Sequence, residues 1–135
     1  MKGVKMTGVE SLANILDTDV LNNIREMTDC FVNRLRPIKV ILFGSFADGT
    51  YTNDSDFDFY IVVPDGSNVR EVSNCAYKSV RYVKQRPVDI VIGTKSRYER
   101  YGRSLHSLYV EGEVYRKGIV LYDCENHPEA RREAV

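Results

Sequence analysis

The apolar positions of the chain follow two different periods. Spacing of three or four residues predicts an amphipathic helix that ends at Pro37 and a second that begins at Ser67 or Asn68 and ends at Pro87. The same spacing predicts one or two further helices across 95–117. These apolar stripes are interpreted as faces that pack on a core, because that is the common role of such a pattern.

Short apolar runs rich in β-branched residues separate these helices and predict buried strands. The predicted strands are 38–43, 56–63 and 88–92, with 119–122 as a shorter edge strand. Helices that alternate with three or four strands predict an α+β fold, in which helices pack on a mixed β-sheet. A single domain is expected over 1–123, with its motif core at 38–92, and 124–135 is expected to be a disordered tail.

Composition narrows the function classes without choosing one. The chain has 135 residues and a formal net charge of zero, so no overall field attracts nucleic acid or an anionic membrane. Direct nucleic-acid binding is therefore not expected. No apolar run approaches the ~20 residues of a membrane span. The start of the chain lacks a leader pattern, and the three cysteines lack metal-ligand spacing, so we expect a cytoplasmic protein with reduced thiols.

Two aspartates occupy a stretch that otherwise has the pattern of a buried strand. Charged side chains in such a place are unfavourable unless they are paired or bind a metal. Asp56 and Asp58 fall on one face of the strand, with Cα atoms about 6.6–6.8 Å apart. Asp89 lies in the run 88–92 on the face opposite its apolar side chains. The three carboxylates converge if these two strands are neighbours that share this face.

Converging carboxylates can bracket two cations ~3.5–4 Å apart, as in nucleotidyl transfer, and Mg²⁺ suits carboxylate and phosphate oxygens. Asp56 and Asp58 would hold both ions. Asp89 would complete the ion that activates the attacking hydroxyl, or accept its proton. A calcium loop is an alternative, but Phe59 and Asp65 stand where an EF-hand needs Gly and Glu. A structural role for each aspartate alone is another, and it does not explain Asp89.

Gly44 and Ser45 follow the first predicted strand at a tight turn. Backbone N–H groups at a strand-to-helix turn, together with a hydroxyl, can bind the phosphates of a nucleotide. Ser45 is also a candidate N-cap for a brief helical turn. A Gly-Ser pair is a weak signal alone, and it gains weight from the aspartates that follow after ten intervening residues.

The combined motif resembles the nucleotidyltransferase superfamily of DNA polymerase beta. The wording LFGSFADG, DSDFDFYIVV and RPVDIVI is similar to the small bacterial MNT-type nucleotidyltransferases, and EGEVYRKGIVLYD resembles the end of such domains. The likeness spans about residues 20–122. It implies a polymerase beta-like fold and transfer of a nucleoside monophosphate, AMP from ATP, to a hydroxyl with two Mg²⁺ ions. The matching positions are Gly44 and Ser45 for the phosphates, and Asp56, Asp58 and Asp89 for the metals.

The resemblance also implies a partner. Many MNT-type proteins are antitoxins beside HEPN-domain toxins, and some transfer AMP to a tyrosine of the toxin. The expected function is therefore that of an adenylyltransferase antitoxin acting on a HEPN-domain protein. Transfer to a small molecule of the aminoglycoside kind is an alternative, as is a catalytically weak antitoxin that acts by binding. A homo-oligomer is compatible with each of these interpretations.

Two positions depart from the family pattern. Relatives often carry arginines after the Gly-Ser pair, as in GSRARG, where this chain has Phe46 and Asp48. The loss of two cations near a triphosphate is expected to weaken NTP binding or to shift the role to other residues. Candidates for that role, with a solvent-exposed helix face as the alternative, are Lys95, Arg97, Arg100 and Arg103.

Overall fold

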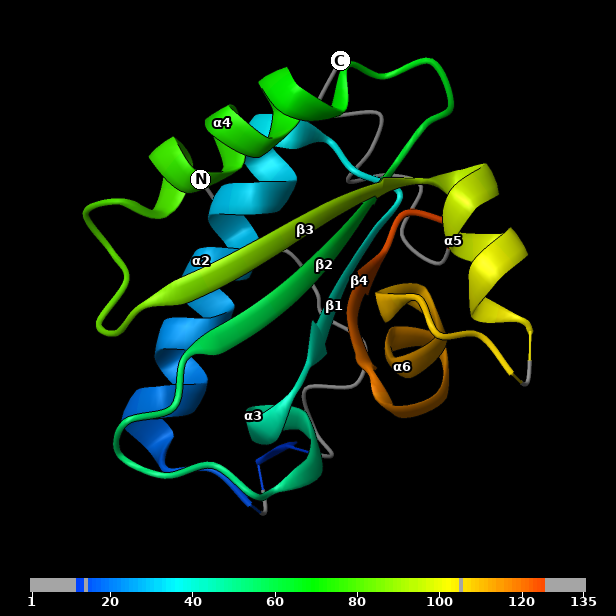
Figure 1. Cartoon of the computed structure of the whole chain (residues 1–135). Coiled ribbons are helices and arrows are strands. Elements are labelled where there is room, and N and C mark those ends of the chain that lie inside the picture. The colour runs from blue at the N-terminus through cyan, green and yellow to red at the C-terminus, as the bar shows by residue number, and fades with distance from the viewer. Residues whose placement is uncertain (1–11, 14, 105, 126–135) are drawn as a thin grey trace.

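The computed structural model describes residues 12–13, 15–104 and 106–125, and the predicted tail beyond residue 125 lies outside this part (Figure 1). The elements in chain order are α2 (Thr18–Leu35), β1 (Lys39–Phe43), α3 (Ser45–Asp48), β2 (Phe57–Val63), α4 (Val69–Val80), β3 (Val88–Thr94), α5 (Lys95–Gly102), α6 (Val110–Lys117) and β4 (Ile119–Asp123). No helix in the described ranges is long and apolar enough to cross a membrane.

The strands form one mixed sheet in the order β3-β2-β1-β4. β1 pairs antiparallel with both β2 and β4, whereas β2 and β3 are parallel. The parallel pair is joined through α4, as the connection between parallel strands requires a crossover. The predicted α+β fold with a mixed sheet is confirmed, and β4 is the edge strand expected near 119–122.

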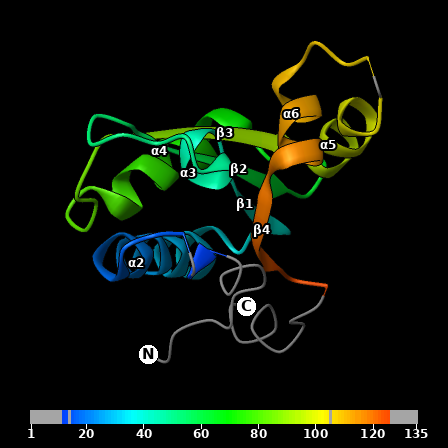
Figure 2. The same ribbon diagram turned by 90° about the horizontal axis from the view of Figure 1, so that it is seen from below.

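Helices cover both faces of this sheet, and alternate side chains of β2 contact different helices. Phe59 packs edge-on against Phe31 of α2, with ring centroids 5.1 Å apart. The next residue, Tyr60, points to the other face and contacts Tyr98 of α5 at 5.7 Å. Seen from below, α2 lies on one side of the sheet, and α5 and α6 lie on the other (Figure 2). The face of Asp58 is therefore the one that α5 and α6 partly cover.

The strand predicted to end at residue 92 continues through Gly93 to Thr94. Gly93 is buried, and a Cβ added there would overlap the hydroxyl group of Tyr60. Glycine at this position therefore makes room for the tyrosine ring on the neighbouring strand. The Tyr60 hydroxyl donates a hydrogen bond of 2.7 Å to Glu111 Oε2 on α6. The sequence pattern placed a strand end where the structure has a close packing contact.

Helix α4 begins as expected but ends earlier than Pro87. Its N-cap Asn68 accepts a hydrogen bond from the Glu71 backbone N–H, as the capping spacing predicts. The helix stops at Val80, and the chain then turns toward β3. Asn23 of α2, which is buried, fixes this turn by donating to Val83 O at 2.8 Å and accepting from Gln85 N–H at 3.0 Å. A long-range contact therefore overrides the helical pattern of 81–86.

We predict that Asn23→Ala lowers the free energy of unfolding by about 1–3 kcal/mol, because two backbone groups of the α4–β3 turn lose their partner in a buried setting. Asn22→Ala is a matched control, since this neighbour is exposed and should change stability by less than about 0.5 kcal/mol. Urea unfolding of both variants measures the difference. Equal stability of the two variants would show that Asn23 does not hold the turn.

Candidate active site

The turn after β1 brings the backbone against the Asp58 side chain. Gly44 has φ 76°, and a Cβ added there would overlap Asp58 Oδ2. A side chain is therefore excluded both by backbone conformation and by space. Phe43, the last residue of β1, pairs with Asp58 across the sheet. The expected N-cap role of Ser45 is wrong, because Gly44 occupies that position and Ser45 is the first residue of α3.

The parallel register brings two of the three predicted carboxylates side by side. Asp58 on β2 is the direct partner of Asp89 on β3, so their side chains share one face of adjacent strands, about 4.8 Å apart. Asp56 lies just before β2, which begins at Phe57 and not at the expected residue 56. Burial, followed by the charges of Asp89, Asp56 and Glu113, raises the pKa of Asp58 to about 6.

Burial is the first cause of this raised pKa, and the neighbouring carboxylates that add to it give the cluster a negative charge that favours a bound cation. Within the described ranges, no three carboxylate, imidazole or thiol groups form a ready-made metal cage. Mg²⁺ is commonly held by one or two carboxylates together with waters and substrate phosphates, and not by a cage of protein ligands alone. The donor set of Asp56, Asp58 and Asp89 therefore fits such an ion in its chemistry, with phosphate oxygens to complete the coordination.

Comparison with protein families decides the class of protein to which this carboxylate pair belongs. Residues 24–121 match the nucleotidyltransferase domain family. The chain belongs to that family. Its motif core and the mixed sheet are thus those of a polymerase beta-like nucleotidyltransferase domain. Comparison with curated protein sequences gives no match.

Two solved structures are similar to this nucleotidyltransferase domain. One is a candidate nucleotidyltransferase from Sulfolobus solfataricus, with a TM-score of 0.51, 19% sequence identity and coverage of 92% of each chain. The other belongs to a toxin–antitoxin complex with AMP-PNP, with a TM-score of 0.45 and 19% identity, covering 84% of this chain and 82% of that one. The first supports the fold assignment.

Phe46 of the nucleotidyltransferase domain is a core residue. Its ring is fully buried, stacks on Tyr51 at 4.5 Å and contacts Phe57 at 4.7 Å. The Arg86 guanidinium, from the segment between α4 and β3, lies 4.9 Å from the ring centroid of Phe46. An arginine at position 46 would have to leave this aromatic cluster or bury its charge within it. Phe46 is therefore the residue through which α3 packs on the core.

Asp48 at the end of α3 is exposed and holds the loop that follows. It accepts hydrogen bonds from the Thr50 backbone N–H at 2.9 Å and from Thr50 Oγ1 at 2.5 Å. These bonds, and to a smaller extent Lys117 of α6, lower the pKa of the Asp48 carboxyl group. Lys117 is the cation of α6 whose charge acts on Asp48 in this way. The sequence pattern did not single out Lys117.

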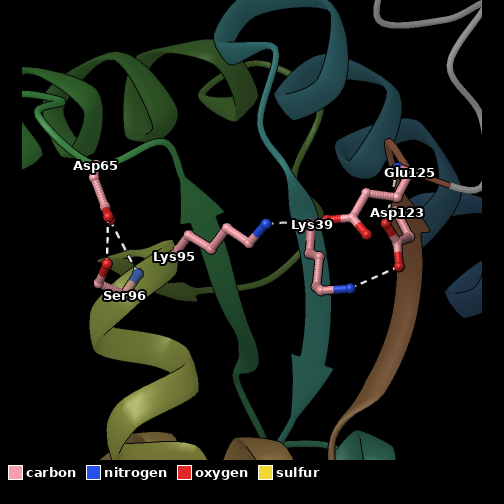
Figure 3. A network of polar contacts seen from close by, with 6 residues as sticks. All are labelled: Lys39, Asp65, Lys95, Ser96, Asp123 and Glu125. Carbon is pink, nitrogen blue, oxygen red and sulfur yellow. Dashed lines mark hydrogen bonds and ion pairs between the residues drawn. The ribbon is translucent and has the colours of Figure 1, made fainter.

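The cations proposed as substitutes for the family arginines are partly engaged elsewhere. Lys95 forms an ion pair of 3.4 Å with Glu125 (Figure 3). Arg97 Nε pairs with Glu111 Oε2 at 3.0 Å. Arg100 lies over the Tyr101 ring at 5.6 Å, and Arg103 is exposed beyond the end of α5. The structure therefore does not gather these four residues at the aspartates.

Helix α6 adds two acidic residues that sequence reasoning missed. Glu113 is exposed, and its charge acts on Asp58. Glu111 is almost fully buried. Its Oε2 accepts hydrogen bonds from the Tyr60 hydroxyl and from Arg97 Nε, and its Oε1 has no hydrogen-bond partner among the described residues. Both residues lie in the segment that resembles the end of the family's domains. Nothing in their helical spacing signals that α6 returns to the face of Asp58.

Asp58 should titrate near pH 6 in metal-free protein, well above an ordinary aspartate. The carboxyl ¹³C shift measured against pH in the presence of EDTA checks this value. Because the pKa in the folded state is above that in the unfolded state, the folded protein binds more protons between these values. The free energy of unfolding contributed by this group therefore falls as the pH rises from 3.8 to about 6.

Matched variants separate the causes of this titration. Asp89→Asn should lower the pKa of Asp58, since Asp89 is the largest of the charges that raise it. Asp54→Asn is the control, because this exposed aspartate is not among those causes. An Asp58 resonance that titrates near pH 4 in every variant would contradict the described charge cluster.

Position 46 provides a test of the core role of the aromatic ring. Phe46→Arg, which introduces the residue common in relatives, should lower the free energy of unfolding by about 3 kcal/mol or more, through lost packing and a buried charge. Asp48→Arg places the same residue at an exposed position and should change stability by no more than about 1 kcal/mol. Thermal and urea unfolding compare them, and a stable Phe46→Arg variant would refute the core assignment.

Proposed function

We propose that this nucleotidyltransferase domain is a Mg²⁺-dependent adenylyltransferase that moves AMP from ATP to a hydroxyl group of a partner protein. The partner proposed is a HEPN-domain toxin, and the modification neutralises it. The observation that carries the catalytic part is the register of Asp58 with Asp89 on adjacent parallel strands beside Gly44. The choice of AMP and of a HEPN-domain partner rests on the resemblance of the sequence motifs to MNT-type antitoxins.

In the proposed reaction, the acceptor oxygen attacks the α-phosphorus of ATP and forms a new P–O bond. The bond from the α-phosphorus to the oxygen bridging to the β-phosphorus breaks, and pyrophosphate leaves. Mg²⁺, where bound, would stabilise the charge of this leaving group. Asp89, on the exposed rim of the carboxylate cluster, accepts the proton of the hydroxyl. Asp56 and Asp58 would hold the metal ions, with Asp89 completing the ion next to the hydroxyl, and the Gly44–Ser45 turn would bind the phosphates.

A second candidate function is neutralisation by binding, with little or no transfer. The position of the α5 cations favours it, because Lys95 and Arg97 are paired with Glu125 and Glu111. Fewer cations then remain to bind the triphosphate. Asp48, in place of a family arginine, adds a negative charge at the end of α3. The two functions share the same partner and differ in their need for the aspartates.

The test is transfer of label from [α-³²P]ATP, in the presence of Mg²⁺, to a HEPN-domain protein encoded by an adjacent gene. Wild-type protein should label the partner and add the mass of AMP to it. Asp56→Ala combined with Asp58→Ala should reduce the rate by at least about 10²-fold, because the metal ligands are removed. Asp54→Ala, an exposed aspartate close by in the sequence, should leave the rate near that of wild type.

The same variants distinguish the candidate functions. If the double variant still neutralises the partner and the wild type adds no label, neutralisation by binding replaces the catalytic proposal. Release of pyrophosphate that depends on an added aminoglycoside and not on a protein would instead support a small-molecule acceptor. Labelling of the partner by the double variant would remove the aspartates from the mechanism.

A further inference from the structure

The corner between α5 and α6 exposes apolar side chains that the core does not use. Leu108 is fully exposed, and Tyr109 and Val110 are 53% and 36% exposed. Contiguous exposed apolar residues of this kind mark interaction surfaces in soluble proteins. They lie immediately before and at the start of α6. This helix is on the opposite side of the sheet from α2 (Figure 2).

A groove of about 440 Å³ opens at this corner. Its lining residues are Tyr101, Ser104, His106, Ser107, Leu108 and Tyr109. The Tyr101 and Tyr109 rings contact each other with centroids 4.3 Å apart. Tyrosine rings offer a large apolar contact area at a small loss of conformational entropy, and they are enriched in binding surfaces. The groove therefore combines an aromatic wall with hydroxyl and imidazole groups that can hydrogen-bond.

Arg97 stands at this aromatic wall in a fixed orientation. Its guanidinium carbon lies 4.9 Å from the ring centroid of Tyr101 and 5.4 Å from that of Tyr109. Its Nε is held by buried Glu111, which also accepts the hydroxyl of Tyr60. The other guanidinium N–H groups have no acceptor in the described part of the chain, and the side chain is 47% exposed. The free N–H groups of the guanidinium are suited to bind a carboxylate of a ligand through two hydrogen bonds.

The charge of this region adds to the same preference. Residues 95–117 carry six lysines and arginines against three glutamates, a net charge of +3 in a chain whose formal net charge is zero. Arg100 and Arg103 extend the positive charge along α5 from the aromatic wall. A complementary partner therefore carries negative charge next to apolar groups.

We propose that Arg97, Tyr101, Leu108, Tyr109 and Val110 form a docking surface for a partner protein, which inserts a segment with carboxylates beside aliphatic or aromatic side chains. The fully exposed leucine and the neighbouring valine favour a protein over RNA, since aliphatic side chains offer no stacking face to bases. This surface would bind the protein that accepts AMP, and in this respect the proposal rests on the proposed function. Binding itself needs no nucleotide.

A selection from a phage-displayed library of random peptides tests the chemistry of the surface. Peptides enriched on the full chain should carry Asp or Glu next to Leu, Phe or Tyr. Their affinity should fall by at least about tenfold in Leu108→Asp, because an exposed apolar anchor is replaced by a charge that repels them. Arg100→Glu should weaken them through charge alone. Tyr82→Asp is the control, as this exposed aromatic lies beyond α4.

Titration calorimetry with the HEPN-domain protein, without ATP, applies the same variants to the proposed partner. Loss of binding in Leu108→Asp and not in Tyr82→Asp supports the surface. Equal binding by both variants, or enriched peptides without carboxylates, would overturn it. If the chain binds a labelled oligo(U) RNA and Leu108→Asp weakens that binding, the surface is a site for RNA and not for a partner protein. ATP binding by Leu108→Asp reports on the nucleotide site separately, so failure of the surface and failure of the proposed catalysis are distinguishable.

Discussion

The arrangement of the active-site face depends on one pairing, that of Asp58 with Asp89 on adjacent parallel strands. Two like charges at strand spacing repel each other, and their partial burial increases the repulsion. Burial first, and then the charge of Asp89, raise the pKa of Asp58 to about 6. The sheet maintains the pairing because the opposite face of the same strands is a continuous aromatic and aliphatic core. The favourable burial of apolar side chains on one face thus offsets the repulsion between the two carboxylates on the other face. A bound cation would reduce that repulsion.

The parts of this arrangement that the sequence predicted are those governed by local periodicity. Alternation along a strand is sufficient to place Asp58 and Asp89 away from the apolar face, whereas Asp56 lies just before β2. Their convergence required 56–63 and 88–92 to be neighbours that share this face, and the parallel pairing of β2 with β3 in the structure meets this condition. The mixed sheet followed from the order of elements. Their ends were less predictable, because Asn23 stops α4 from a distance of sixty residues along the chain.

The parts that could not be predicted arise from contacts between distant elements. Gly93 has the pattern of a strand breaker, and it is a strand residue because the Tyr60 ring needs its space. Phe46 stands where the pattern that the motif resembles often has an arginine, and its role is set by Tyr51, Phe57 and Arg86 around it. Helix α6 packs on the face of β2 that carries Asp58, although about fifty residues separate the two elements in the sequence. No local signal shows which of its acidic residues becomes buried and which faces the aspartates.

Helix α6 connects the carboxylate cluster with the surface at the α5–α6 corner. Tyr60 stands two residues after Asp58 on the same face of β2, and its hydroxyl meets Glu111. Glu111 in turn holds Arg97 against the rings of Tyr101 and Tyr109. A partner carboxylate bound by Arg97 would add a second anion near Glu111, whose Oε1 has no hydrogen-bond partner among the described residues. The side chains of Arg97, Glu111 and Tyr60 thus form one hydrogen-bonded chain from the docking surface to the face of β2 that carries Asp58.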